Sequence, residues 1–243
     1  MRSGIITFTP EELFWLAGLF EGEGSFYKGY SNTSSSPIVS ITMTDEDVIQ
    51  RIAQALGISA ISYESRNGFA GANAKRRHKA SMVGQAAVSF MQLLMPHMSS
   101  RRQEQIERAT SAFAPKIKFP HRQYLLLEAS NERSALYWLA GILEGEGSFE
   151  NTRSWGEYIY PKVVIGSTDL DVVERVQKYW SELYGGRQKI NSAQTLIKSG
   201  KTFHRIWMRG RAAARQMRDI YPILGHRRQS TIRTILADKL PEI

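Results

Sequence analysis

The strongest constraint on the fold of this chain is a segment that occurs twice. Residues 15–26 read WLAGLFEGEGSF and residues 138–149 read WLAGILEGEGSF, so ten of the twelve positions are identical. The likeness continues downstream, where TDEDVIQRI from Thr44 parallels TDLDVVERV from Thr168. The spacing of 123 residues between the copies is far longer than the unit of a solenoid, which runs to tens of residues. The sequence therefore predicts a duplicated domain.

We divide the chain into an N-terminal repeat at residues 1–113, a linker at 114–130 and a C-terminal repeat at 131–243. Pro115 and Pro120 favour the linker interpretation. Each repeat is long enough to bury a core of its own.

The amino-acid composition limits the kinds of molecule that this chain is expected to bind. The chain has 32 Lys and Arg against 23 Asp and Glu, a net charge of +9, and a hydrophobic content of 42% that is typical of a folded globular protein. The absence of Cys excludes disulfides and thiolate metal sites. Apolar stretches are too short to span a bilayer, so no membrane partner is expected. The positive charge favours a polyanion.

Each repeat predicts the same order of elements. Thr9, Pro10 and Glu12 form a helix start with a capping box, and glycines end that helix near Glu21. Two strands, an amphipathic helix, two more strands and further helices follow. The expected fold class is α+β: two pseudo-symmetric αββαββα halves, each with a four-stranded antiparallel sheet backed by helices.

Glycines inside the two repeated helices predict how the halves meet. Gly18 and Gly22 lie four residues apart in the first helix, as do Gly141 and Gly145 in the second. Glycine inside a helix costs about 1 kcal/mol relative to alanine. Because glycine has no Cβ, two backbones can approach very closely there. We expect the two helices to pack about a pseudo-twofold axis, with their C-terminal ends side by side.

Two acids, Glu23 and Glu146, follow those helix ends. A helix C-terminus carries partial negative charge, so two carboxylates brought together there repel unless a cation compensates. Oxygen ligands and a need for bound water favour Mg²⁺. One to three such ions would suit phosphodiester hydrolysis, in which an activated water attacks and the leaving oxygen is neutralised.

With the motif copies LAGLFEGEG and LAGILEGEG, nearly the whole chain resembles a monomeric LAGLIDADG homing endonuclease. The resemblance implies that Glu23 and Glu146 are the catalytic metal ligands. It also implies metal-binding backbone carbonyls at Gly22 and Gly145. The expected cofactor is Mg²⁺, with Mn²⁺ or Ca²⁺ able to occupy the same site.

A second set of catalytic candidates departs from the usual pattern. Relatives often place a lysine near the scissile phosphates, whereas this chain has Arg101 and Arg227 in the corresponding region. Arginine keeps its proton, so it stabilises phosphate charge but does not act as a general base. Glu21 and Glu144, inside the motifs, are expected to be structural.

By the same resemblance, the two sheets form one saddle on double-stranded DNA. Side chains alternate between the faces of a strand, which places Phe26 and Ile61 toward the helices and Tyr27 toward DNA. The predicted DNA-binding residues are Tyr27, Ser40, Thr42, Ser62, Glu64, Arg66, Lys75, Arg77, Lys79 and Ser81 in the first half, and Lys162, Arg187, Lys189, Asn191, Arg205 and Trp207 in the second.

The leading hypothesis is a site-specific endonuclease that cuts both strands of a long, non-palindromic DNA target and leaves short 3′ overhangs. It would work as a monomer inside the cell, where the host DNA lies. An RNA-splicing maturase on the same fold, with intron RNA as partner, is the alternative. A DNA-binding regulator that does not cleave is the third hypothesis.

Overall fold

The computed structural model describes residues 8–30, 35–63, 76–111, 132–153, 159–186, 188–194 and 202–236. The predicted linker lies outside the described residues, so the domain boundaries stay predictions. Four predicted DNA-binding residues also lie outside them: Glu64, Arg66, Lys75 and Arg187.

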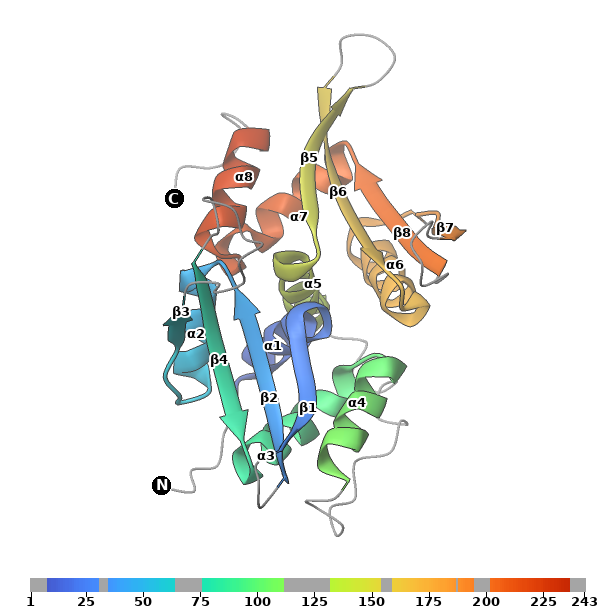
Figure 1. Cartoon of the computed structure of the whole chain (residues 1–243). Coiled ribbons are helices and arrows are strands. Elements are labelled where there is room, and N and C mark those ends of the chain that lie inside the picture. The colour runs from blue at the N-terminus through green and yellow to red at the C-terminus, as the bar shows by residue number, and fades with distance from the viewer. Residues whose placement is uncertain are drawn as a thin grey trace.

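The two halves repeat one order of elements (Figure 1). The first half contains α1 (Pro10–Glu23), β1 (Gly24–Tyr30), β2 (Ser35–Met43), α2 (Glu46–Ala55), β3 (Ile61–Tyr63), β4 (Arg77–Val83), α3 (Gln85–Leu94) and α4 (Ser100–Thr110). The second contains α5 (Glu132–Gly145), β5 (Ser148–Arg153), β6 (Ile159–Ser167), α6 (Leu170–Tyr184), β7 (Asn191–Gln194), β8 (Thr202–Arg209), α7 (Arg211–Ile220) and α8 (His226–Leu236). The αββαββα order is confirmed, and one further helix, α4 or α8, completes each half.

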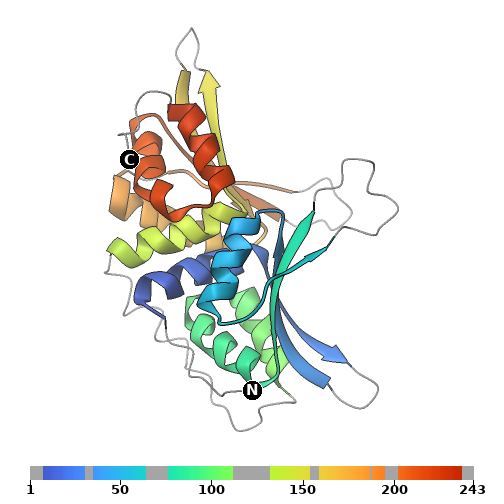
Figure 2. The ribbon, with the colours of Figure 1, turned by 90° about the vertical axis from the view of Figure 1, so that its left-hand side faces the viewer.

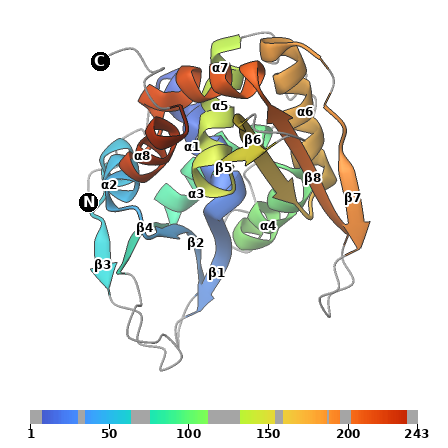
Figure 3. The same cartoon turned by 90° about the horizontal axis from the view of Figure 1, so that it is seen from above.

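Each half contributes one antiparallel sheet of four strands, in the orders β1-β2-β4-β3 and β5-β6-β8-β7. The α+β prediction is therefore confirmed. Strands β1 and β5 lie near the middle of the molecule, whereas β3 and β7 form the outer edges (Figure 3). Most helices lie on one side, and the strands extend away from them on the other (Figure 2). The strands thus offer a broad surface that the helices leave uncovered.

The N-terminus of α1 forms as its sequence predicts. The backbone N–H of Glu12 donates to Thr9 Oγ1 at 3.2 Å, and the N–H of Thr9 donates to Glu12 Oε2 at 3.0 Å. The C-terminus differs from expectation, because α1 continues past Glu21 to Glu23. Glu23 is therefore the last helical residue, whereas Glu146 follows the end of α5.

Helices α1 and α5 pack against each other at the centre of the molecule (Figure 1). Their glycines are required for this approach. A methyl carbon placed on Gly18 would lie 2.1 Å from the carbonyl oxygen of Trp138, and one placed on Gly141 would lie 2.1 Å from that of Trp15. The predicted glycine-lined contact is thus present, and both tryptophans are buried beside it.

None of the helices in the described ranges is long and apolar enough to cross a membrane.

Candidate active site

The glycine contact brings the two motif acids together. The Cγ of Glu23 lies 2.7 Å from the position of a methyl carbon placed on Gly145. The Cγ of Glu146 lies 2.9 Å from the corresponding position on Gly22. Each acid therefore lies against a glycine of the opposite helix. This crossed arrangement is the juxtaposition that the sequence predicts, while the catalytic role of the two acids and the metal-binding role of all four residues stay predictions.

Both carboxyl groups have a raised pKa. Burial is the main cause for Glu23, opposed by the positive charges of Arg228, Arg102 and Arg227. Burial is also the main cause for Glu146, and the negative charge of Glu23 raises its pKa further. The two carboxyls therefore repel each other, which a shared divalent cation would relieve.

The donor set suits a hard cation that keeps part of its water. Within the described part of the chain, no group of three or more His, Cys, Asp or Glu side chains is placed to hold a metal. A cation between Glu23 and Glu146 would therefore complete its shell with oxygens of backbone carbonyls, water or phosphate. Mg²⁺ binds in this way, through one or two carboxylates plus water and substrate phosphates. The residues present fit the expected ion.

Two arginines that the sequence reasoning had left without a role cap the motif helices. Arg102 Nη2 donates to the Gly22 carbonyl at 2.9 Å, and Arg228 Nη2 donates to the Gly145 carbonyl at 2.9 Å. These arginines supply partners and positive charge to carbonyls that lack an intrahelical bond. The glycine carbonyls predicted as metal ligands thus already accept one hydrogen bond each. The RRQ triplet common to both repeats was the available signal.

The other two motif acids make contacts that suit the structural role predicted for them. Glu21 accepts hydrogen bonds from the backbone N–H of Ser99 at 2.6 Å and from its hydroxyl at 2.7 Å. Glu144 accepts one from the N–H of Gly225 at 2.6 Å. Each acid thereby joins the end of a motif helix to the start of α4 or α8.

The two remaining predicted catalytic residues are held from the opposite half. Arg101 of α4 forms an ion pair with Asp169, with Nε 2.6 Å from Oδ2. Arg227 of α8 forms one with Asp45, with Nε 2.6 Å from Oδ1. Both arginine side chains stay substantially exposed, at 39% and 45%. They remain accessible to phosphate beside the paired acids.

Strand pairing in the first sheet supports most of the predicted outward side chains. Ser40 is paired with Ser81 and Thr42 with Lys79, so these residues share one face, opposite the buried Val39, Ile41 and Met43. Arg77 lies on the same face, and so does Tyr27, which is paired with Ile38 and is 41% exposed. Ser40 is covered by its neighbours, with 7% of its surface exposed.

The prediction that Ser62 lies on the outward face with Lys79 is wrong. Pairing with β4 places Ser62 opposite the buried His78, whose Nδ1 lies 2.8 Å from the serine hydroxyl. Ile61 is paired with Lys79 instead, and it is 57% exposed on the outward face, together with Tyr63. The alternation is reversed because β3 is a three-residue edge strand. Its register comes from β4, and no core contact requires Ile61 to be buried.

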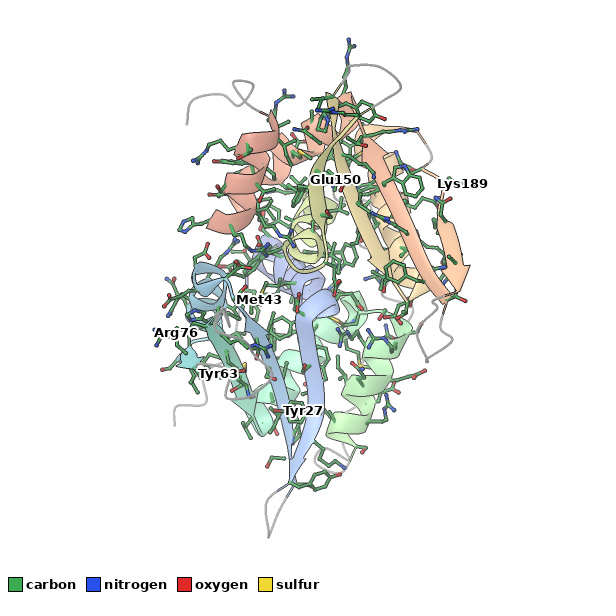
Figure 4. All side chains as sticks on the ribbon, turned by 45° about the horizontal axis from the view of Figure 1, so that its top comes forward. Tyr27, Met43, Tyr63, Arg76, Glu150 and Lys189 are labelled. Carbon is green, nitrogen blue, oxygen red and sulfur yellow. The ribbon has the colours of Figure 1, made fainter. Side chains whose placement is uncertain are left out.

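The second sheet presents a different set of outward side chains. Asn191 is paired with Arg205, and Trp207 follows two positions along β8 on the same face. Lys162 faces outward but is paired with Glu150, with Nζ 2.7 Å from Oε1. Lys189 precedes β7 and is exposed. Figure 4 shows Lys189 and Tyr63 at the opposite outer edges of this surface, with Tyr27 and Glu150 nearer the middle.

Comparison with known proteins agrees with this architecture. Residues 10–84 match the family model of the LAGLIDADG-like domain. Among curated protein sequences, none matches the chain significantly.

Solved structures match over most of both chains. LAGLIDADG homing endonuclease I-GzeII in complex with its DNA target is 12% identical, with a TM-score of 0.53, and the match covers 93% of this chain and 88% of that one. Meganuclease I-SmaMI bound to uncleaveable DNA is 14% identical, with a TM-score of 0.55 and coverages of 92% and 88%. LAGLIDADG meganuclease I-AabMI bound to uncleaved DNA is 12% identical, with a TM-score of 0.55 and coverages of 96% and 90%. At these identities the likeness establishes the fold.

Proposed function

We propose that this chain, which carries a LAGLIDADG-like domain and has the fold of LAGLIDADG homing endonucleases, is a site-specific DNA endonuclease. It would cut both strands of a long duplex target and leave short 3′ overhangs. The observation that carries the proposal is the crossed pair Glu23 and Glu146, each lying against a glycine of the opposite helix where α1 packs on α5.

The chain's own residues divide the work of hydrolysis. Glu23 and Glu146 would hold Mg²⁺, and the ion would supply a Lewis acid that lowers the pKa of water and offsets charge on the phosphate. Arg101 and Arg227 stabilise the charge of the phosphates on the two strands. Because a guanidinium does not deprotonate in proteins, the proton of the attacking water passes to bulk solvent rather than to these side chains.

The outward face of the two sheets recognises the DNA target. Phosphate contacts from Lys79 and other cations position the duplex, while polar side chains such as Asn191 read base edges in the major groove. The equivalent positions differ between the halves. Arg77 precedes His78 in β4, Phe203 precedes His204 in β8, and the two histidines occupy equivalent positions in the two sheets. A surface that differs in this way favours a non-palindromic target.

Cleavage of the joined flanking exons is the direct test, because a homing enzyme cuts the sequence that its own element interrupts. The purified protein is incubated with a plasmid carrying that junction and Mg²⁺, and binding is measured separately in Ca²⁺. We expect linear product from the wild type. Glu23→Gln and Glu146→Gln should each abolish cutting and still bind, whereas Glu107→Gln, an exposed change on α4, should cut normally.

Two results would overturn the proposal. One is an intact plasmid at saturating protein. The other is preferential binding of the intron RNA over the junction duplex in a gel-shift competition, which would favour the maturase alternative.

A further inference from the structure

We infer that Asp45 and Asp169 are positioning residues, each of which holds an arginine from the opposite half beside the acid of its own half. Asp45 holds Arg227 near Glu23, and Asp169 holds Arg101 near Glu146. This inference rests on the proposed endonuclease function and adds that each cleavage centre is assembled from both halves of the chain.

The helix starts give the first support. Asp45 is the N-cap of α2 and Asp169 is the N-cap of α6, positions where aspartate usually accepts a backbone N–H bond worth about 1 kcal/mol. In these described helices, neither aspartate accepts such a bond. Both carboxylates bind a guanidinium of the other half instead. At two equivalent sites an arginine of the other half takes the place of the usual backbone N–H, which indicates that both aspartates have the same role.

The geometry of the pairs suits positioning. Arg227 binds Asp45 through two parallel contacts, Nε to Oδ1 at 2.6 Å and Nη2 to Oδ2 at 2.8 Å. The side chain of Asp45 is 8% exposed, and that of Asp169 is 12% exposed. A largely buried anion therefore fixes each exposed cation, and at Arg227 the bidentate contact fixes the plane of the guanidinium as well as its place. Donors of each guanidinium remain for a phosphate.

Both pairs lie in hollows beside the motif acids. One hollow is lined by Glu23, Asp45, Arg227 and Arg77, among others. The other is lined by Glu146, Asp169 and Arg101 together with further residues. In each hollow the proposed cation ligand, Glu23 or Glu146, comes from the same half as the aspartate, and the arginine held by that aspartate comes from the other half. Losing one aspartate should therefore impair one centre and spare its counterpart.

Neighbouring aspartates provide a matched control. Asp47 and Asp171 lie two positions further along the same helices, and each accepts a hydrogen bond from the other half of the chain. They accept the backbone N–H of His226 at 2.7 Å and of Ser100 at 2.8 Å. Their loss weakens the contact between the halves without removing the anion that holds Arg227 or Arg101.

The test is strand-resolved cleavage of a linear duplex that carries the target, with a different label at the 5′ end of each strand, together with cleavage of a supercoiled plasmid that carries the same target. We expect Asp45→Asn to slow the cutting of one strand by about 10- to 100-fold, and Asp169→Asn to slow the other strand similarly, so that nicked plasmid accumulates. The loss should appear in kcat more than in KM. Asp45→Glu, which keeps the carboxylate, should recover part of the lost rate. Asp47→Asn and Asp171→Asn should leave the ratio of the two strand rates unchanged.

Equal slowing of both strands by Asp45→Asn, or no slowing, would overturn the inference while the wild-type enzyme still cuts. A failure of Asp45→Glu to exceed Asp45→Asn would also count against it. If the wild type itself cuts neither strand, the proposed function fails instead.

Discussion

Replacing Gly18 with alanine should force the two motif helices apart. The added methyl carbon would lie 2.1 Å from the carbonyl oxygen of Trp138 and 2.8 Å from the backbone nitrogen of Ile142. Carbon–oxygen contacts are normally about 3.3 Å or longer, so the helices must separate by roughly 1 Å. The obstructing atoms belong to helical backbone, so no side-chain rotation relieves the clash.

The net cost can be estimated from two opposing effects. Overpacking of this kind costs about 3 kcal/mol, at the upper end of its usual range, because backbone is involved. Alanine regains about 1 kcal/mol of helix propensity over glycine. We expect a net loss of about 2 kcal/mol, which for a chain of this size lowers Tm by roughly 4 to 8 °C.

Thermal unfolding followed by circular dichroism measures this loss, and Gly22→Ala is the matched control. A methyl carbon on Gly22 would be too close only to the side chain of Glu146, at 2.9 Å from its Cγ, and would make an ordinary contact of 3.5 Å with Cδ1 of Ile142. That variant should keep or slightly raise the Tm but lose cleavage, because Glu146 is displaced. A Gly18→Ala protein as stable as the wild type would refute the close-packing argument.

Three further predictions concern stability and binding. Burial, with the nearby charge of Arg175, lowers the pKa of His97 to about 4. Between pH 6.5 and about 4, His97 therefore binds a proton in the unfolded chain but not in the folded chain. Stability should therefore fall as pH drops through that window, by at most about 3 kcal/mol, and His97→Gln should flatten this slope in pH-dependent denaturant unfolding. Ser99→Ala removes a hydroxyl that both binds buried Glu21 and caps α4, so urea unfolding should show a loss of about 1 to 3 kcal/mol; a loss no larger than that of Ser111→Ala, at an exposed site, would contradict this role. Lys79→Ala should weaken duplex binding and lower the slope of log affinity against log salt by about 1, measured by fluorescence anisotropy, and an unchanged slope would place Lys79 away from phosphate.

The central features were predictable because the repeat encodes them locally. A glycine repeated at equivalent helical positions has few explanations other than close approach, so Gly18 and Gly141 indicated the contact between α1 and α5. The meeting of Glu23 and Glu146 followed from that contact. Strand alternation likewise placed the outward residues of β2 and β4, where buried neighbours fix the register.

The rest depended on partners that leave no local pattern. The orientation of β3 is set by its pairing with β4, so Ser62 was misplaced. Arg102 and Arg228 bind backbone carbonyls, which every residue carries. No complementary side chain in the sequence therefore indicates their role. The bond between Arg227 and Asp45 joins residues 182 positions apart, and only the folded pseudo-twofold arrangement brings them together.

The claim that Glu23 and Glu146 jointly hold a cation can be tested by anomalous scattering. Crystals of the protein with uncleaved junction duplex and Mn²⁺ would be measured near the manganese absorption edge. The account predicts an anomalous peak in contact with carboxylate oxygens of both residues and with phosphate oxygen. Manganese bound elsewhere, with the two carboxylates left without a metal, would contradict it.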